Sequence, residues 1–439
     1  MHSVYRNSIF ILSQTNHARI PMPLEIDLES YLEKYRWKEH AGFYRPAFGK
    51  GSIADIPDSI LLTQGVKAFN SGVPPIRPDP ADHTIFILID GFGYSSLEYA
   101  LRMKGNGILS AFLNGSSLIP VTSIFPSTTS TATVTLHTGM DPEEHGIIGY
   151  LQYRAEVGAV CNMISMSPVG MWNRSIADNR GFSHIRYHGT LHQRFKGEDI
   201  PSYLYMPYSI RNSGLTRITG TGSILRPYHS PAHMVMEIQR DLKSCSGRSF
   251  HFAYLSSVDT ISHKVGPYTE ANAMEIESTF RFISDLISGL KGTRSSILIS
   301  ADHGHTEVDQ EKITDVALNR KLRKMMISPM TGDGRSPNFR IREYDSNNFL
   351  EAIGKIAMDA EVVASSDMIS DGMFGRKGIS GISRDAFGDY FLLYHENRAM
   401  IDSSITALDP EWNASDMIGM HGGLTYEEMI VPFIHKNVP

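Results

Sequence analysis

The chain of 439 residues has only two cysteines, Cys161 and Cys245, and no long hydrophobic run. Two cysteines make neither a disulfide framework nor a cysteine-rich zinc finger, so we expect thiols that are buried or have no functional part. The most apolar run, Ile85–Ile89, is far too short to cross a membrane. Ser8–Ser13 is too short for the apolar part of a secretory signal and lacks a clear cleavage site. We therefore expect a cytoplasmic protein without a membrane partner.

The chain also lacks an excess of positive charge. Lys and Arg total 41 and Asp and Glu total 47, which gives a net charge of −6. Broad affinity for nucleic acids requires a positive field around the protein, so we expect no stable nucleic-acid complex, although a local basic groove is compatible with these totals. A soluble chain of this length can bury a large core in one to three domains.

The segment richest in functional groups is 124–150, which reads IFPSTTSTATVTLHTGMDPEEHGIIGY. Hydroxyl side chains occupy 127–131, and small and apolar residues then continue to Gly139. The pattern predicts a strand end, a hydroxyl-rich turn and a short helix that ends at Gly139. Backbone N–H groups at such a helix N-terminus can bind a phosphate or sulfate group, but hydroxyl residues are also common helix caps. This segment alone leaves both interpretations open.

Four distant segments carry acidic and imidazole side chains next to predicted strands. They contain three carboxylates and three imidazoles, namely Asp90, Asp259, Asp302, His263, His303 and His421. Taken singly, each has an ordinary use in a turn, a cap or an ion pair. Open α/β sheets, however, place ligands at the carboxyl ends of their strands. With one alcohol, this set could hold two divalent metals around an activated hydroxyl.

As a set, these motifs resemble the alkaline phosphatase superfamily, and most closely its nucleotide pyrophosphatase/phosphodiesterase branch. The resemblance rests on Asp90-Gly91, on FPSTT at 125–129, on GMDPEEHGI at 139–147, and on the Asp-x-x-x-His, Asp-His-Gly and His-Gly-Gly motifs in the family order. It covers about residues 83–310 and 415–436. It implies an α/β fold with a doubly wound, mostly parallel sheet, helices on both faces and an inserted small α+β subdomain.

The resemblance also implies two divalent metal ions, with zinc preferred and manganese or magnesium as alternatives. The residues that match the family's ligands are, for one ion, Asp259, His263 and His421, and for the other, Asp90, Asp302, His303 and Thr129. Counting back from Gly139, Thr129 rather than Thr128 falls where the family has its nucleophilic Thr, so the resemblance selects Thr129. Coordination to a metal can lower the pKa of this alcohol, which is otherwise a poor nucleophile.

Ala132 departs from the family. The diesterases usually carry an Asn at this position, which contacts a phosphoryl oxygen, so here the metals, backbone N–H groups or another side chain would have to take its place. His305 is an additional imidazole, for which we expect a supporting role near the metals or none. His145 matches a family histidine that we expect to be structural.

The hypothesis that follows is a hydrolase of phosphodiesters or nucleotide pyrophosphates that acts through a phosphothreonine intermediate on a small phosphate ester or nucleotide. One alternative is a phosphomonoesterase or phosphonate hydrolase on the same scaffold, and another is a metal-binding protein without turnover. A sulfatase is disfavoured because its Cys/Ser-x-Pro-x-Arg motif is not at the site. As substrate contacts we select Arg211 and Arg335, the latter in the Gly-rich loop 331–335. Weaker candidates are Trp172, Asn173, Arg174 and Tyr228.

Four regions are expected along the chain. Residues 1–80 would be an N-terminal extension that ends in the proline-rich linker 71–80, and it could cover a sheet edge or join copies in a homo-oligomer. Residues 81–305 would form the catalytic core with a substrate-side insertion at 151–250, 306–414 an inserted subdomain, and 415–439 the return to the core. Helical patterns cover 24–37, 271–290 and 347–358, and strand patterns cover 85–89, 250–257, 295–300, 338–342, 390–394 and 428–434.

Overall fold

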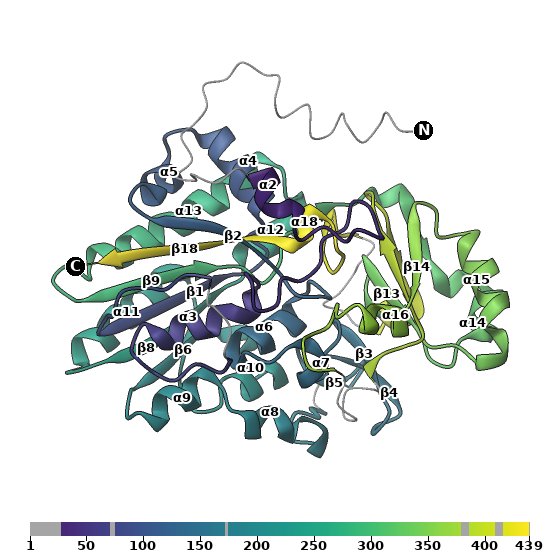
Figure 1. Cartoon of the computed structure of the whole chain (residues 1–439), viewed down its shortest axis with the longest axis horizontal. Coiled ribbons are helices and arrows are strands. Elements are labelled where there is room, and N and C mark those ends of the chain that lie inside the picture. Colours follow the sequence, from purple (N-terminus) through teal and green to yellow (C-terminus); the bar gives the residue numbers. More distant parts are fainter. Residues whose placement is uncertain (1–27, 71–74, 172–173, 379–385, 409–415, 439) are drawn as a thin grey trace.

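The computed structural model describes residues 28–70, 75–171, 174–378, 386–408 and 416–438. A seven-stranded sheet with the order β2-β18-β9-β1-β8-β6-β7 crosses the larger part of the molecule (Figure 1). Its strands are β1 (His83–Ile89), β2 (Ser117–Thr122), β6 (Ser202–Pro207), β7 (Ile224–Tyr228), β8 (Ser249–Leu255), β9 (Ser295–Ser300) and β18 (Ile430–Val438).

The centre of this sheet is parallel and buried. Strand β1 lies between β8 and β9 in parallel register, with Ile87 opposite Ala253 and Ile299. Its apolar residues are buried on both faces, as the uninterrupted run 85–89 predicts. Only β18 opposes the other strands, since it is antiparallel to both β2 and β9. The predicted mostly parallel sheet is therefore confirmed.

Helices cover both faces of the sheet. One group packs around α13, and its members are α4 (Tyr94–Lys104), α5 (Ile108–Leu113), α11 (Pro231–Ser244), α12 (Ser257–Val265) and α13 (Glu270–Ser288). A second group packs around α6, and its members are α3 (Ile56–Leu62), α6 (Thr129–Thr138), α9 (Leu191–Gly197) and α10 (Gly214–Thr219). Figure 1 shows α4, α5 and α13 on one side of the strands and α6, α9 and α10 on the other. The doubly wound arrangement places the carboxyl ends of the central strands at one edge.

A second seven-stranded sheet has the order β14-β15-β13-β12-β3-β4-β5. Its strands are β3 (Leu151–Arg154), β4 (Ala159–Asn162), β5 (Ser167–Pro168), β12 (Thr331–Asp333), β13 (Ser336–Phe339), β14 (Ala360–Ala364) and β15 (Tyr390–Tyr394). The predicted division assigned 151–250 to the core and 306–414 to a subdomain. The structure instead joins strands of both regions in one sheet, because β12 pairs with β3 through Gly332 and Leu151.

The remaining elements are short. Two small sheets pair β10 (Thr306–Glu307) with β17 (Gly419–Met420) and β11 (Ile313–Asp315) with β16 (Ala399–Ile401). The other helices are α2 (Leu28–Glu33), α7 (Pro142–His145), α8 (Ser183–His188), α14 (Arg320–Met325), α15 (Ser346–Gly354), α16 (Ser365–Ser370), α17 (Ser403–Thr406) and α18 (Tyr426–Met429).

The region predicted as an N-terminal extension packs into the main core. Trp37, Phe43 and Ile60 are buried in the same hydrophobic cluster as the central strands. Ser52 forms a β-bridge to Thr122 at the end of β2. The described residues of this region therefore stabilise the sheet directly. Residues 24–27 and 71–74, which the predicted helix and linker include, lie outside the described residues.

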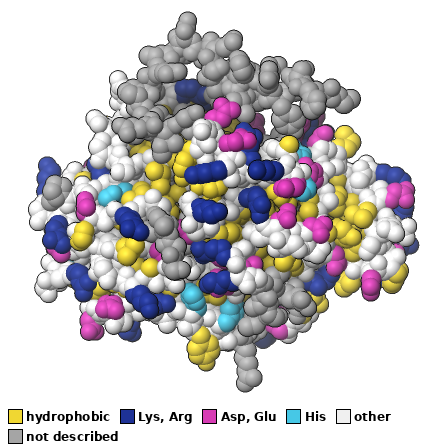
Figure 2. Space-filling view, in the orientation of Figure 1, with side chains coloured by type: hydrophobic (Ala, Val, Ile, Leu, Met, Phe, Trp, Pro, Cys, Tyr) yellow, Lys and Arg dark blue, Asp and Glu magenta, His cyan; other side chains and the backbone are white. Residues whose placement is uncertain are grey.

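Several local predictions shift in the structure. The strand predicted over 338–342 is β13, which ends at Phe339, and the helix predicted over 347–358 is α15, which ends at Gly354. The last strand was predicted to include Glu428, which belongs instead to α18, and β18 begins at Ile430. The strand predicted over 250–257 ends at Leu255, because Ser257 already begins α12. Among the described residues, no helix is both long and apolar enough to span a bilayer. On the face shown in Figure 2, Lys and Arg side chains lie among acidic and apolar ones.

Candidate metal centre

The carboxyl ends of three adjacent strands bring the predicted carboxylates together. Asp90 follows β1, Asp302 follows β9, and Asp259 lies in α12, which begins just after β8. His303 joins the first two, since its Nε2 atom lies 3.5 Å from Asp90 Oδ1 and 3.5 Å from Asp302 Oδ2. One ligand atom from each of these three residues lies within 4.8 Å of the others, a spacing that suits one metal ion.

A second group of ligand atoms surrounds Asp259. The Nε2 atom of His263 lies 3.2 Å from Asp259 Oδ1. The His421 ring lies 5.1 Å from the His263 ring and stacks on the His303 ring at 3.7 Å between centroids. The structure therefore brings the six predicted protein ligands close together, but the ligand atom of His263 belongs to neither of the two groups whose atoms all lie within 4.8 Å of one another. His305 is also there, since its ligand atom and those of Asp259, His303 and His421 lie within 4.8 Å of one another.

The three predicted imidazoles share one orientation. Each has its Nδ1 atom within hydrogen-bond distance of a backbone carbonyl, which is Gly419 for His263 (2.7 Å), Gly304 for His303 (3.2 Å) and Ser127 for His421 (3.1 Å). Because a carbonyl only accepts, the Nδ1 atoms carry the hydrogen and the Nε2 atoms present their lone pairs to the cluster. This is the arrangement that metal-binding histidines adopt.

The electrostatics of the cluster fit divalent cations. Burial, together with the carboxylates of Asp259 and Asp302, raises the pKa of Asp90 well above its ordinary value. Burial and the neighbouring imidazoles of His303, His305 and His263 hold the pKa of His421 well below its ordinary value, so this ring is neutral. Asp259 Oδ1 and Asp302 Oδ2 are buried and have no hydrogen-bond partner among the described residues. Crowded, unpartnered acceptors of this kind are stabilised by cations.

Thr129 lies beside this cluster at the N-terminus of α6. Its Oγ1 atom is 3.1 Å from His303 Nε2 and 3.5 Å from Asp90 Oδ1. The preceding hydroxyl is placed differently, because Thr128 is buried and donates a 2.9 Å hydrogen bond to Asp333 Oδ1. Of the two alcohols that the sequence offered, Thr129 is therefore the one beside the predicted ligands. Helix α6 ends where predicted, at Gly139 in the left-handed conformation.

Sequence reasoning missed two residues that support this site. The hydroxyl of Tyr254 donates to Asp90 Oδ2. The carboxylate of Asp333 binds Thr128 and also accepts a 3.3 Å hydrogen bond from the Tyr150 N–H group, and burial raises its pKa to about 6. Tyr254 is opposite Leu88 in the β1–β8 pairing. This register places the Tyr254 side chain near Asp90. The pairing register of two strands cannot be read from the sequence, so this contact was not predicted. Asp333 belongs to the Gly-rich loop 331–335, in which only Arg335 was predicted to have a function.

The prediction that Arg335 contacts a substrate anion is wrong. Its side chain is fully buried, and its guanidinium forms an ion pair with Glu428, with Nη2 3.2 Å from Oε2 and Nε 3.3 Å from Oε1. The other guanidinium hydrogen bonds go to the backbone carbonyls of Tyr394, Glu396 and Arg398. Since these contacts use the donors of the guanidinium, Arg335 stabilises the loop and leaves nothing for a ligand.

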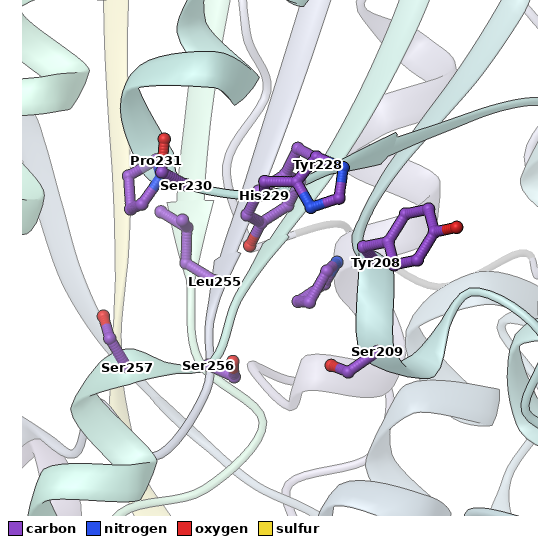
Figure 3. A pocket seen from close by; sticks show the side chains of 10 residues that line it. Tyr208, Ser209, Tyr228, His229, Ser230, Pro231, Leu255, Ser256 and Ser257 are labelled. Carbon is purple, nitrogen blue, oxygen red and sulfur yellow. The ribbon is translucent and has the colours of Figure 1, made fainter.

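A cavity of about 450 Å³ lies at the carboxyl ends of β6, β7 and β8 (Figure 3). Ser256 and Ser257 line it, and Ser257 begins the helix that carries Asp259, so the cavity is next to the metal centre along the sheet edge. On another side the Tyr208 and His229 rings stack at 4.6 Å.

The other predicted substrate contacts have different positions. The Arg211 guanidinium covers the Tyr208 ring at 3.5 Å, at the margin of the cavity. Tyr228 lines the cavity, while its hydroxyl donates to the Tyr254 carbonyl. Arg174 is exposed. Trp172 and Asn173 lie outside the described residues.

The remaining residues named from the sequence are Ala132, His145 and the two cysteines. Ala132 packs in the main hydrophobic core. His145 is buried within hydrogen-bond distance of the Thr135 hydroxyl and accepts from the Ile147 N–H group, contacts that suit the structural role expected for it. Cys161 and Cys245 form no disulfide, and Cys161 is buried.

Comparisons with known proteins show which fold and which family the chain shares. No curated protein sequence matches the chain. Murine ectonucleotide pyrophosphatase/phosphodiesterase 5 has a similar structure, with a TM-score of 0.61 at 15% identity over 80% of this chain and 87% of that one. Phosphonoacetate hydrolase from Sinorhizobium meliloti, in complex with phosphonoformate, gives a TM-score of 0.59 at 16% identity over 81% and 90%. The family model of type I phosphodiesterase/nucleotide pyrophosphatase matches residues 84–368, and the chain belongs to this family.

Proposed function

We propose that the chain is a metal-dependent phosphodiesterase or nucleotide pyrophosphatase with Thr129 as its nucleophile. The observation that carries this proposal is the position of Thr129 Oγ1, which lies 3.1 Å from His303 in the group that also contains Asp90 and Asp302. A buried set of carboxylates and imidazoles beside a single partly exposed alcohol is the arrangement that phosphoryl transfer through an alkoxide requires.

Two divalent ions would be held by the residues assigned above, Asp259, His263 and His421 for one and Asp90, Asp302, His303 and Thr129 for the other. Zinc suits these nitrogen and oxygen donors, and manganese or magnesium are alternatives. When bound, the ions would lower the pKa of the Thr129 hydroxyl and offset negative charge on the phosphoryl oxygens. The backbone carbonyls behind the imidazoles fix the direction of the Nε2 atoms, and Tyr254 fixes the Asp90 carboxylate.

In the proposed reaction Thr129 Oγ1 forms a bond to phosphorus while the bond from phosphorus to the leaving-group oxygen breaks. The hydroxyl proton passes to solvent, and the leaving group takes a proton from water. A water molecule then attacks the phosphothreonine, splits its phosphorus–Oγ1 bond, and releases a phosphomonoester and free Thr129. Thr129 is partly exposed, whereas Thr128 and Ser130 are buried, so water can reach the intermediate.

The N-terminus of α6 would stabilise the transferred group in place of the family's Asn. The first hydrogen bond within this helix runs from the Ala132 N–H group to the Thr128 carbonyl. The N–H groups of the preceding turn, at residues 129–131, therefore have no acceptor within the helix. Together with the helix dipole they favour an anion beside Thr129. This account gives Ala132 no contact with substrate, in keeping with its burial in the core.

The ester group that stays on the transferred phosphorus would enter the cavity beside α12. Its aromatic pair and serine hydroxyls suit a ring that carries hydroxyl groups, and Arg211 at its margin suits an added negative charge. A nucleotide has this composition. An inactive threonine-to-alanine variant of the murine relative has been observed with AMP bound, which supports both the nucleotide and the role of a threonine.

A phosphonate hydrolase is the second candidate. The likeness to phosphonoacetate hydrolase, which covers 90% of that chain, favours it. In that case the same alcohol would attack a phosphonate, and a carbon–phosphorus bond would break in place of an oxygen–phosphorus bond.

The test compares substrates and variants in zinc-loaded protein. Four substrates separate the candidates. They are bis(p-nitrophenyl) phosphate, p-nitrophenyl phosphate, a p-nitrophenyl nucleotide ester and phosphonoacetate. We expect the diester and the nucleotide ester to react fastest, and Thr129→Ala to lower kcat by roughly 10³-fold or more while zinc content stays the same.

The matched control is Thr133→Val, one turn further along α6, because the Thr133 hydroxyl is buried and has no partner among the described residues. It should leave kcat unchanged. Full activity in Thr129→Ala with loss of activity in Thr128→Ala would transfer the nucleophile to Thr128. Hydrolysis of none of these compounds would favour a binding protein without turnover.

A further inference from the structure

His305 has the geometry of a metal ligand, although neither its motif nor the family pattern assigns it one. The side chain is fully buried beside the other histidines. Its ring centroid lies 4.8 Å from that of His263, 5.1 Å from that of His421 and 5.4 Å from that of His303. Its Nε2 atom is 3.2 Å from Asp259 Oδ1.

The hydrogen bonding of His305 repeats that of the three predicted imidazole ligands. Its Nδ1 atom lies 3.3 Å from the Gly91 carbonyl oxygen. Since a carbonyl only accepts, Nδ1 carries the hydrogen and Nε2 presents its lone pair to the cluster. Four imidazoles from three separate segments thus turn Nδ1 to the backbone and Nε2 to the same space.

The two facing atoms, His305 Nε2 and Asp259 Oδ1, need a cation between them. Both are buried, and both have no hydrogen-bond partner among the described residues. Two lone pairs at 3.2 Å repel each other, and this repulsion is strong where water does not screen it. With metal–ligand bonds of about 2.0–2.1 Å, two ligands of a tetrahedral zinc ion are roughly 3.3 Å apart. The observed separation of these atoms is close to that value.

The backbone makes room for this imidazole. Gly91 follows the predicted ligand Asp90 and has a positive φ of 70°. A Cβ atom at position 91 would lie 2.5 Å from His305 Cε1, which is closer than such atoms approach. The glycine of the Asp90-Gly91 motif is therefore required in this chain by the His305 ring as well as by the turn.

We propose that His305 Nε2 is a fourth protein ligand of the ion held by Asp259, His263 and His421. The inference rests on the proposed two-metal function, and it makes the two metal sites unequal. The ion beside Asp259 would have three imidazoles and one carboxylate, a donor set that prefers zinc or cobalt to magnesium. The ion beside Thr129 would keep a majority of oxygen ligands and would exchange more readily.

The experiment measures metal binding by the full chain in the absence of substrate. Crystals of zinc-loaded protein, with anomalous scattering at the zinc edge, should show an ion about 2.0–2.1 Å from His305 Nε2. Zinc titration against a chromogenic chelator should show that His305→Gln weakens one of two sites by at least 10-fold and leaves the other unchanged. His435→Gln, which changes a buried histidine on β18 that contacts Ser296, is the matched control and should bind both ions as the wild type does.

The outcomes separate this inference from the proposed function. Two ions in the wild-type crystals with His305 Nε2 more than about 3 Å from both would overturn the inference alone, because the imidazole would then be a hydrogen-bond donor to Asp259. Absence of any zinc in the wild type would overturn the proposed function as well. The wild-type crystals decide the matter even if His305→Gln fails to fold.

Discussion

At the scale of single residues, the hydroxyl before Thr129 is held by a carboxylate from the other sheet. Thr128 donates to Asp333 Oδ1, and Asp333 Oδ2 accepts from the Tyr150 N–H group. Asp333 thus fixes the residue that immediately precedes α6 and, through it, the direction of the Thr129 side chain. We regard Asp333 as a positioning residue, since none of its described contacts reaches the predicted metal ligands.

Asp333→Ala should lower kcat for the diester by about 10-fold, with a small change in KM and unchanged zinc content. The physical reason is the loss of a hydrogen bond worth about 1.5 kcal/mol, which is about a factor of ten in rate if it acts mainly on the transition state. Steady-state kinetics and metal analysis check this. Asp333→Asn, which can still accept from Thr128, is the control and should retain most of the activity. Equal losses in both variants would show that the charge of Asp333 matters more than its position.

Glu98 gives the clearest dependence of stability on pH. It lies on α4, accepts a 3.4 Å hydrogen bond from the Tyr426 hydroxyl, and burial raises its pKa from 4.5 to about 7. The folded chain therefore holds a proton that the unfolded chain releases. Its contribution to stability is fully present below pH 4.5 and is lost as pH rises toward 7, by about 3 kcal/mol at most.

Urea unfolding at several pH values between 4.5 and 7.5 tests this contribution. Glu98→Gln should be less sensitive to pH than the wild type over this range, because the amide does not titrate. Glu29→Gln changes an exposed glutamate on α2 and should keep the wild-type dependence. If Glu98→Gln and the wild type lose the same free energy of unfolding as pH rises, burial does not raise the pKa of Glu98.

At the scale of elements, the turn between β12 and β13 is joined to α18 by a buried ion pair. Arg335 comes from the turn and Glu428 from the helix, and both side chains are fully buried. Glu428 also accepts hydrogen bonds from the Gly423 N–H group and the Thr425 hydroxyl, at 2.8 Å each. The pair therefore connects the second sheet to the loop that carries His421.

Arg335→Met should lower the free energy of unfolding by about 3–5 kcal/mol, because it leaves the Glu428 carboxylate buried without its cation. The double variant Arg335→Met with Glu428→Gln should recover part of that loss. Chemical denaturation measures both values, and KM for the diester in the folded variants should stay close to that of the wild type. A large rise in KM without loss of stability would restore Arg335 as a substrate contact.

At the scale of the whole molecule, the candidate metal centre joins distant parts of the chain. Its ligands follow β1, β8 and β9 of the main sheet, while His421 follows β17, near the end of the chain. The second sheet supports the centre through Asp333. Ions at this position therefore contact only the folded arrangement, and their binding free energy adds to its stability.

Removal of the metals with a chelator should lower the Tm, and added zinc should restore it in a concentration-dependent way. An ion present at 100 times its dissociation constant stabilises the folded state by about 2.7 kcal/mol. Calorimetry measures the effect. In Asp302→Asn, which removes a predicted ligand, the zinc-dependent gain should be smaller, whereas Asp178→Asn, at an exposed ion pair, should respond as the wild type does. A Tm that zinc does not change would contradict metal binding at this centre.

Much of the main sheet could be predicted because its signals are local. The run 85–89 is β1, the pattern over 295–300 is β9, and the amphipathic repeat over 271–290 is α13. Glycine at 139 ends α6 because a residue without a side chain adopts the left-handed conformation at low cost. The ligands of the proposed centre were predicted from the resemblance to the family, because each side chain taken alone has an ordinary use at the end of an element.

The sequence by itself determined the elements, their order and the chemistry available at their ends, since periodicity and turn residues act over a few positions of the chain. Tertiary structure decided which side chains meet. It buried Arg335 against Glu428, turned Asp333 toward Thr128 and placed His305 among the other imidazoles. These contacts join residues that are distant in the chain. They depend on strand register and on how the two sheets pack, which local patterns do not encode.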